Sequence, residues 1–396
     1  MRQFLVLGAG KMGLVLAKDL IESGPQNGVT IVDISPQRLD RARSLIATSR
    51  LEVCRGDMED EMQRESFIKG KDVVLNALLH RHSLPVLETA VRNAVHFVDL
   101  AGEGADARMS HDQEARRRGI TILSGMGLSP GITNVLVGRA VHDLEETEKA
   151  LIFCGGNPVH PKPPLDYRIV YALDSLINFY ERPALIIRHG QREKVAPLTE
   201  VEPVGFPPDF PDMECFFTDG LSSLLQTMGG KIRGDLYEKT VRHRGHARGF
   251  KTLQECGFFS KEPILVGDRR VIPRQVSETL LEERMNLGED EDVTLLRILV
   301  SGKKSGVPET HVFEMVDYSD PVNKHTSMAR TTSFPASIAA QMIASGQVAD
   351  RGAVFPENVF DRDLFPVFMD GLKKRGVVIS HEIVRRQQKG DDQPPE

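Results

Sequence analysis

The stretch that decides the fold is Phe4–Gly13, FLVLGAGKMG. A short apolar run leads directly into the pattern Gly8-x-Gly10-x-x-Gly13, and apolar residues then recur at helical spacing. In such a turn Gly8 allows a tight passage from strand to helix, Gly10 lets the backbone approach a pyrophosphate, and Gly13 lets helix and strand pack closely. The phosphates bind free backbone N–H groups at the positive end of the helix dipole. The stretch therefore predicts a dinucleotide-binding turn.

A carboxylate at the end of the second predicted strand bears on the type of dinucleotide. The run VTIVD ends at Asp33, 25 residues after Gly8, where a ribose-binding carboxylate is expected. Such a carboxylate accepts hydrogen bonds from both ribose hydroxyls and repels a 2′-phosphate, so we predict NAD rather than NADP. Arg38 and Arg41 are near enough in sequence to bind a 2′-phosphate, but we expect them on the exposed face of the following helix.

Strand and helix patterns alternate through Gly127, which predicts an α/β Rossmann domain, a doubly wound parallel sheet with ligands at the carboxyl ends of its strands. Asn76 and Asp99 fall at two predicted strand ends, and Asp57 follows the third strand, beside the expected adenine position. Each of these three could instead be an ordinary turn or loop-cap residue. The residues expected to bind the cofactor are Gly8, Gly10, Lys11, Met12, Gly13, Asp33, Asp57 and Asn76.

After residue 127 short strands joined by hairpins replace this alternation, which predicts an α+β domain with a mixed, mostly antiparallel sheet. The later segment SFPASIAAQMIASG, residues 333–346, is typical of a helix capped by Ser333 with Pro335 in its first turn. We therefore predict a Rossmann domain at residues 1–127 and a substrate domain at 128–332. A segment at 333–385 is expected to return to the first domain, and 386–396 to form a disordered tail.

The bulk composition indicates a globular protein without an obvious macromolecular partner. The net charge is −6 and the pI is near 6.1, which gives no reason to expect nucleic acid as a partner. Four cysteines are scattered without metal-ligand spacing, so we expect reduced thiols, a cytoplasmic location and no metal. No stretch approaches the roughly 18 apolar residues of a membrane span, and the first apolar run is too short for a signal peptide.

The segment from Lys239 to His246, KTVRHRGH, concentrates basic residues where a strand ends and a helix is expected to begin at Ala247. Cations at a helix N-terminus oppose the dipole, so the arrangement is unfavourable unless an anion lies there. We predict that the anion is a substrate carboxylate held by the bidentate guanidinium of Arg242. The alternative is a solvated basic turn that pairs with nearby glutamates. The histidines of this segment lack carboxylate or thiolate partners at metal-ligand spacing.

Several motifs together resemble the saccharopine dehydrogenase-like family, and particularly its lysine 6-dehydrogenase branch. They are VLGAGKMG, VLNALLH, HFVDLAG, GMGLSPGITN, FFTDGLSSLL, EKTVRHRGH and TTSFPASIAAQMIASG, and in this order the resemblance extends from residue 4 to about 360. The resemblance implies a nucleotide domain, a substrate domain with a mixed sheet and a carboxyl-terminal segment packed on the first domain. It also implies oxidation at a C–N bond of an amino acid, for which NAD is the cofactor that Asp33 predicts. We expect a homodimer or a higher homo-oligomer.

The oxidation requires a neutral amine, because a protonated nitrogen has no lone pair to stabilise the developing iminium. A general base is therefore expected, and His80, Asp99 and His246 are the candidates. Asp219 is a candidate partner for a substrate ammonium, although it could equally cap a helix starting at Gly220. Two alternatives stay open. One is a saccharopine or carboxynorspermidine-type dehydrogenase, and the other is a non-catalytic dinucleotide-binding sensor or scaffold.

Overall fold

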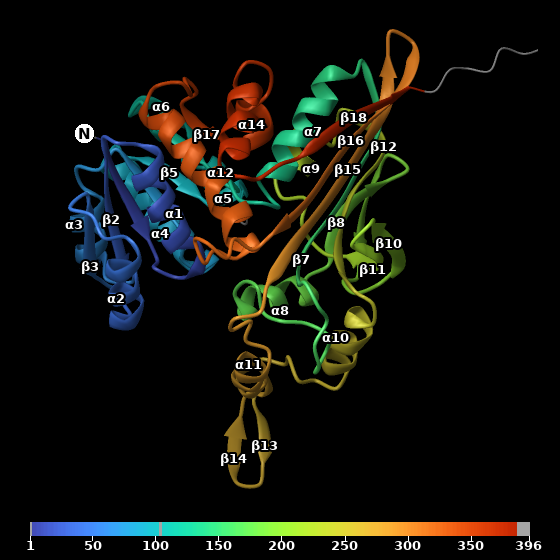
Figure 1. Ribbon diagram of the computed structural model, residues 1–396, viewed down its shortest axis with the longest axis horizontal. Helices are drawn as coiled ribbons and strands as arrows, with labels where there is room; N and C mark the ends of the chain where they lie inside the picture. The colour runs from blue at the N-terminus through green and yellow to red at the C-terminus, as the bar shows by residue number, and fades with distance from the viewer. Residues whose placement is uncertain (1, 103–104, 386–396) are drawn as a thin grey trace, which may run out of the picture.

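The computed structural model describes residues 2–102 and 105–385, and the tail expected at 386–396 lies outside them. The chain forms two domains side by side, each built on one large sheet (Figure 1). Among the described residues, no helix combines the length and the apolar character needed to cross a bilayer.

The first sheet has seven parallel strands in the order β17-β6-β5-β4-β1-β2-β3, as a doubly wound domain requires. The strands are β1 (Arg2–Leu7), β2 (Asn27–Asp33), β3 (Leu51–Arg55), β4 (Val73–Asn76), β5 (His96–Asp99), β6 (Thr121–Leu123) and β17 (Gly352–Val354). The helices are α1 (Lys11–Ser23), α2 (Pro36–Leu45), α3 (Glu61–Ile68), α4 (Ser83–Arg92), α5 (Ala105–Met109) and α6 (Asp112–Arg117), with a 3₁₀ turn η1 (His80–His82). Residues 4–7 of β1 are fully buried because helices cover both faces of a parallel sheet.

The second sheet is mixed, and its only parallel pair among the described strands is β12 with β7. Its main path runs β10-β11-β12-β7-β15-β16-β18, and β8 pairs with β12 and β9. The strands are β7 (Glu146–Pro158), β8 (Ala184–Arg188), β9 (Gln191–Val195), β10 (Glu202–Phe206), β11 (Phe210–Phe217), β12 (Ile232–His243), β15 (Asp292–Lys304), β16 (Val307–Tyr318) and β18 (Ser380–Arg385). Both halves of the predicted fold class are confirmed.

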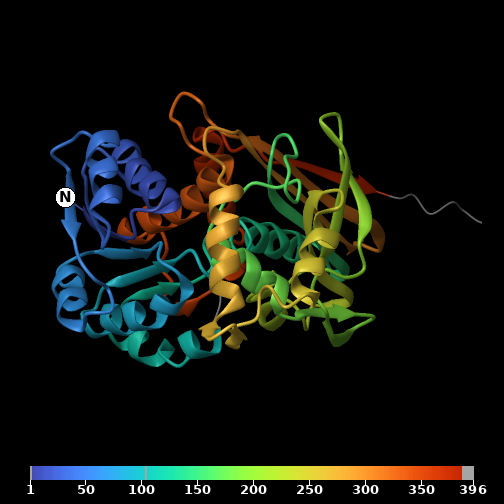
Figure 2. The same cartoon turned by 90° about the horizontal axis from the view of Figure 1, so that it is seen from below.

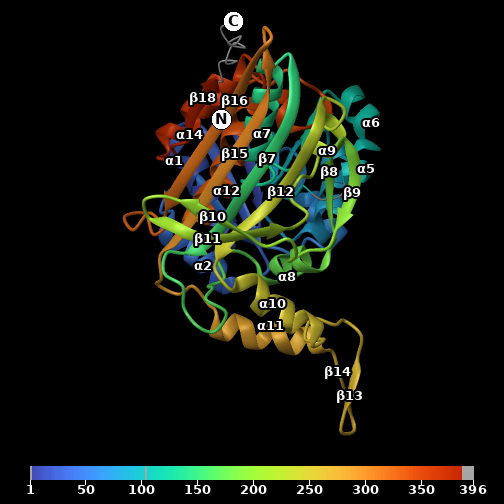
Figure 3. The same cartoon turned by 90° about the vertical axis from the view of Figure 1, so that its right-hand side faces the viewer.

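The remaining elements connect or extend the two sheets. They are α7 (Ile132–Asp143), α8 (Leu173–Glu181), α9 (Leu224–Thr227), α10 (His246–Glu255), α11 (Pro273–Arg284), α12 (Ser327–Ala344), α13 (Pro356–Val359), α14 (Leu364–Lys374) and the hairpin β13 (Ile264–Val266) and β14 (Arg269–Val271). The hairpin projects away from the body beyond α11 (Figures 1 and 3). Seen from below, α11 lies in front of the boundary between the domains (Figure 2).

Helix α12 contacts elements of both domains, including α1 and β15, and it starts earlier than the sequence predicted. The helix begins at Ser327, where the Asp292 carboxylate accepts hydrogen bonds from two backbone N–H groups at 2.7 and 2.9 Å. The prediction that Ser333 caps the helix is therefore wrong. Ser333 lies inside the helix, and its hydroxyl donates to the Met12 carbonyl at 2.9 Å, which ties the helix to the glycine turn. Pro335 is also interior.

The chain after α12 contributes to both sheets. Strand β17 joins the edge of the first sheet beside β6, and β18 adds to the second sheet beside β16. Helix α14, which lies between these two strands in the sequence, packs on α12. The carboxyl-terminal segment therefore connects the two domains around the cleft described next.

Candidate active site

A cleft of about 1140 Å³ lies between the two domains. One wall consists of residues that follow strands of the first sheet, and the other consists of residues from the second domain, a common setting for a ligand site. Nine of the expected site residues line it, namely Gly8, Gly10, Lys11, Met12, Asp33, Asp57, His80, Asp219 and Arg242. Four others lie outside the lining, namely Gly13, Asn76, Asp99 and His246.

The glycine turn has the geometry of a phosphate site. Gly8 has a φ of 97°, in the left-handed region that favours glycine, and a Cβ on Gly13 would overlap the carbonyl oxygen of Gly8. A Cβ on Gly10 would meet no atom within 4 Å, so the backbone there borders open space. No side chain caps the N-terminus of α1, which leaves its first N–H groups available to a diphosphate. The ε-amine of Lys11 donates to the Ile169 carbonyl at 3.4 Å, across to the second domain.

Asp33 closes the turn at the end of β2. Its Oδ2 accepts from the Ala9 N–H at 2.7 Å and its Oδ1 from the Ser35 N–H at 2.8 Å. A carboxylate offers about four lone-pair sites, so two protein donors leave capacity for ribose hydroxyls. Arg38 lies 3.6 Å from Oδ2 with its side chain 61% exposed. It lines the cleft beside Asp33, so the expectation that it decorates the outer face of α2 away from the site is wrong. Ile34, also in the lining, is 57% exposed and offers an apolar surface that the sequence reasoning missed.

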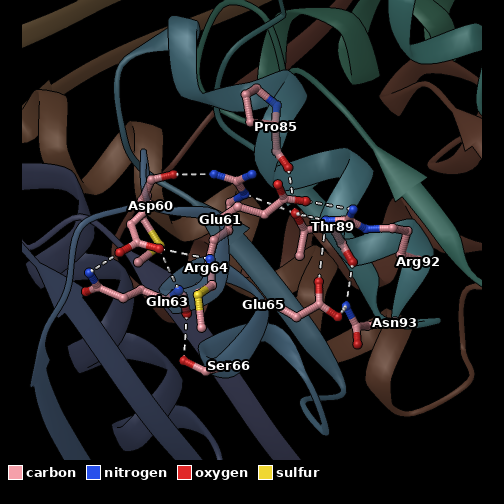
Figure 4. Close-up of polar contacts among 12 residues, drawn as sticks. Asp60, Glu61, Gln63, Arg64, Glu65, Ser66, Pro85, Thr89, Arg92 and Asn93 are labelled. Atoms are coloured by element: carbon pink, nitrogen blue, oxygen red, sulfur yellow. Dashed lines mark hydrogen bonds and ion pairs between the residues drawn. The ribbon is translucent and has the colours of Figure 1, made fainter.

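Asp57 lines the cleft after β3. A polar network that joins α3 to α4 fixes the backbone next to it (Figure 4). The buried guanidinium of Arg64 donates to the Met58 carbonyl at 2.7 Å and to the Thr89 hydroxyl at 3.0 Å. Thr89 in turn donates to the Pro85 carbonyl at 2.9 Å (Figure 4). These contacts hold the loop against α4, in the position where adenine is expected.

Asn76 and Asp99 support the cleft from beneath it. The amide of Asn76 donates to Asp99 at 3.3 Å, and Asp99 pairs with Arg108 at 2.7 Å. The other Asp99 oxygen accepts from the Ala101 N–H at 2.9 Å, so the pair orders a loop that does line the cleft. Burial raises the pKa of Asp99, and Arg108 opposes that shift. Asp99 is fully buried, which places it in a supporting position without access to a substrate.

The two candidate histidines occupy opposite environments. His80 is exposed on η1 and lines the cleft. His246 is fully buried, with its ring 4.5 Å from that of Phe250, and burial lowers the pKa of His246 well below its ordinary value. Its Nε2 and the Tyr180 hydroxyl share a hydrogen bond at 2.9 Å. His246 orients Tyr180 instead of reaching the cleft.

Arg242 lies on β12 with its guanidinium in the cleft, although only 2% of the residue is exposed. Its Nε donates to the Tyr180 hydroxyl at 3.2 Å, and the guanidinium lies 5.2 Å from the centre of the Tyr167 ring. Within residues 2–102 and 105–385, no carboxylate lies within ion-pair distance of it. The guanidinium also donates to the Val241 carbonyl at 2.9 Å, so it has neutral hydrogen-bond partners but no counter-charge, whereas buried charges are normally paired.

The reason given from sequence for the role of Arg242 is wrong, because the anion at the start of α10 belongs to the protein. The Glu214 carboxylate accepts from the Gly245 and Ala247 N–H groups at 2.9 and 2.8 Å, which satisfies the helix N-terminus. Arg244 is exposed and pairs with Asp212 at 2.6 Å. The basic segment therefore separates into an exposed turn and one buried guanidinium.

Asp219 lines the cleft on the second-domain side, 3.7 Å from the Arg182 guanidinium. It does not cap a helix at Gly220, because the next helix begins only at Leu224.

Glu238 is a cleft residue that the sequence reasoning did not propose for the site. It lies on β12 together with Thr240 and Arg242, and all three alternate residues line the cleft. Glu238 is 5% exposed, and its Oε2 accepts from the Ser129 hydroxyl at 2.6 Å. Burial chiefly, with the nearby charge of Asp219, raises the pKa of Glu238 from 4.5 to about 7, and the Ser129 hydrogen bond opposes the shift. The period-2 spacing of Glu238 and Arg242 was the available signal.

The described residues contain no group of three or more His, Cys, Asp or Glu side chains that could hold a metal ion. To the cleft the first domain contributes the dinucleotide turn and the buried carboxylate of Asp33. The second domain contributes the buried guanidinium of Arg242 and the buried carboxylate of Glu238.

Comparisons with known proteins agree with this architecture. The saccharopine dehydrogenase NADP binding domain matches residues 4–123, and the saccharopine dehydrogenase C-terminal domain matches residues 127–377. The chain is 22% identical to saccharopine dehydrogenase [NADP(+), L-glutamate-forming] of Pyricularia oryzae over 458 aligned residues, covering 97% of this chain and 99% of that protein. It is 24% identical to carboxynorspermidine synthase of Vibrio alginolyticus, covering 91% of this chain and 93% of that one.

Among solved structures, the apo histidine-tagged saccharopine dehydrogenase (L-Glu forming) from Saccharomyces cerevisiae superposes with a TM-score of 0.80 at 18% identity. The superposition covers 97% of this chain and all of that one. The resemblance seen in the motifs is confirmed at the level of the family. The chain belongs to the saccharopine dehydrogenase family of oxidoreductases, with the nucleotide-binding and C-terminal domains of that family in order.

Proposed function

We propose that this protein is an NAD-dependent oxidoreductase that acts on the CH–NH group of an amino acid, and most specifically an L-lysine 6-dehydrogenase. The observation that carries the proposal is the buried Arg242 guanidinium, which faces the nucleotide cleft without a carboxylate partner among the described residues. A substrate carboxylate would supply the missing anion through two parallel hydrogen bonds.

The residues of the first domain fit a nicotinamide dinucleotide. The free first turn of α1 beside Gly10 suits the diphosphate, Asp33 suits the adenosine ribose, and the loop at Asp57 suits the adenine edge. When bound, the nicotinamide would accept a hydride from the carbon that bears the substrate amine. The protein's part is to hold the carboxylate at Arg242, exclude water and remove a proton from the amine.

The charges of the cleft favour a substrate with one carboxylate and a distant amine. On the second-domain wall Arg242 lacks a carboxylate partner, whereas the neighbouring Arg182 already lies 3.7 Å from Asp219. The other charged residues of that wall are acidic, namely Asp174, Asp219, Glu238 and Glu282, and carboxylates attract an ammonium and repel further carboxylates. L-Lysine meets this pattern, and its side-chain amine would leave as ammonia after water adds to the imine.

The related proteins suggest a second candidate. A saccharopine dehydrogenase and a carboxynorspermidine synthase are both similar to this chain, and substrates of that kind carry additional carboxylates. Their binding here would require Arg182 to exchange Asp219 for the substrate. A non-catalytic sensor is the remaining alternative, and it gives no reason for a buried guanidinium without a carboxylate partner.

The preference for NAD rests on Asp33. A carboxylate there opposes the 2′-phosphate of NADP, although the matched domain and several relatives carry NADP in their names. Arg38, 3.6 Å from Asp33, is the residue that could serve NADP instead. The homo-oligomeric state and the cytoplasmic location stay predictions, which light scattering and cell fractionation would check.

The proposal is tested by following dinucleotide reduction with NAD⁺ and with NADP⁺ at alkaline pH. The amines to compare are L-lysine, L-ornithine, saccharopine and carboxynorspermidine. We expect turnover with L-lysine and NAD⁺. Turnover with saccharopine alone would select the second candidate, and no turnover with any amine would favour the sensor.

A further inference from the structure

The carboxylate of Glu238 is enclosed at the wall of the cleft without a cationic partner. Among the described residues no Lys, Arg or His lies within ion-pair distance of it, and its one hydrogen-bond donor is the neutral Ser129 hydroxyl. Space for the carboxylate exists because residue 220 is glycine. A Cβ at that position would overlap the Glu238 carboxyl group.

We propose that Glu238 is the general base that takes a proton from the substrate ammonium before hydride transfer. The inference rests on the proposed amine oxidation and names a residue outside the set expected from sequence. Of that set, Asp99 and His246 are fully buried away from the lining, and only His80 lines the cleft.

The spacing of Glu238 and Arg242 matches a lysine held at both ends. Four residues along one strand place the two Cα atoms about 13 Å apart. An extended lysine with a hydrogen bond of about 3 Å at each end spans a comparable length. Both side chains project from the same face of β12 into the cleft. The α-carboxylate would lie at Arg242 and the side-chain amine at Glu238.

The reaction balances with these groups. The ammonium N–H bond breaks, its proton passes to Glu238, and the electron pair stays on nitrogen as a lone pair. The C–H bond next to nitrogen then breaks with its electron pair, which reduces NAD⁺, and a C=N bond forms from the lone pair. A carboxylate with a pKa of about 7 accepts the first proton more readily than one with an ordinary pKa, while it is still ionised at alkaline pH.

The primary test is the pH dependence of kcat/KM for L-lysine with NAD⁺. The wild type should lose activity as the pH falls through about 7, because Glu238 becomes protonated there. Glu238→Gln should lower kcat by roughly 10²- to 10⁴-fold, the usual contribution of a general base. Its residual activity should keep rising with pH toward about 10, where the substrate ammonium loses its proton to solvent without a base from the protein. Glu148→Gln removes an exposed carboxylate of the neighbouring strand β7 and should match the wild type.

The Ser129→Ala variant tests whether Glu238 acts as a base or has only a structural role. The Ser129 hydrogen bond lowers the pKa of Glu238, so its loss should move the acidic limb of the profile to higher pH. A limb that stays in place in Ser129→Ala, or a Glu238→Gln enzyme with wild-type rate and profile, would overturn the assignment. In both cases the wild type still oxidises the amine, so the proposed function survives. A wild type that oxidises none of the amines would overturn both.

A thermal readout tests the titration without turnover. The pKa of Glu238 is about 7 in the folded state and about 4.5 in the unfolded chain. As far as Glu238 is concerned, the folded wild type is therefore most stable below about pH 4.5, where the carboxyl is neutral in both states, and it loses stability as the pH rises through about 7. The melting temperature of Glu238→Gln minus that of the wild type should therefore increase from pH 5 to pH 8, because the neutral glutamine does not titrate. A constant difference over this range would show that Glu238 does not titrate there and would contradict the proposal.

Discussion

Replacing Arg242 with lysine should weaken amino-acid binding and leave dinucleotide binding intact. Lysine keeps the positive charge but loses the planar fork, so one of two parallel hydrogen bonds to the substrate carboxylate disappears. The hydrogen bond to Tyr180 and the contact over the Tyr167 ring are lost as well. A hydrogen bond to a charged group contributes about 1.5–3 kcal/mol. At about 1.4 kcal/mol per factor of ten, KM for L-lysine should rise by roughly 10- to 100-fold.

The assay combines steady-state kinetics with a separate measurement of dinucleotide affinity. The chain contains no tryptophan, so the fluorescence of NADH can be followed on binding without energy transfer from tryptophan. Arg244→Lys is the matched control, because Arg244 lies two residues away, is 62% exposed at its side chain and pairs with Asp212. A normal KM in Arg242→Lys, or a loss of NADH affinity with normal amino-acid kinetics, would refute the clamp.

Three further substitutions test other parts of the account. Asp33→Ser should weaken NAD binding by roughly tenfold, through loss of a charged hydrogen bond to ribose, and improve the relative use of NADP, which kinetics with both dinucleotides will show. Gly220→Ala should lower kcat at least as much as it changes KM, because its Cβ would displace the Glu238 carboxyl group, and unchanged kinetics would contradict the packing described. Glu214→Ala should lower the free energy of unfolding by about 1–2 kcal/mol, measured by urea denaturation, because α10 loses its charged cap.

The first domain could be predicted from sequence because its signals are local. The glycine turn, the apolar strands and the carboxylate at Asp33 are each set by a few adjacent residues, and the structure has them in the expected order. The start of α12 could not be predicted in this way. Thr326 caps the helix locally, by accepting from the Ala329 N–H at 3.2 Å, but the first two N–H groups are bound by the Asp292 carboxylate, which reaches the helix from β15.

The charged residues of the candidate site were also hard to predict from sequence, because their partners are distant along the chain. The basic segment suggested an anion at the start of α10, but Glu214 approaches from β11 and satisfies that helix. Arg242 lines the cleft, and its guanidinium donates to the Tyr180 hydroxyl and not to an anion at that helix. Burial of Glu238 likewise depends on Gly220 and Ser129, which are distant in sequence. Long-range contacts of this kind leave no local pattern.

The most direct test of the central claim is the identity of the products when the wild-type protein is incubated with L-lysine and NAD⁺. The account predicts NADH and ammonia in equimolar amounts, together with the lysine-derived semialdehyde or its cyclic imine, identified by mass spectrometry. Ammonia without NADH, NADH without ammonia, or reduction only in the presence of saccharopine would contradict the oxidation of a lysine side-chain amine in this cleft.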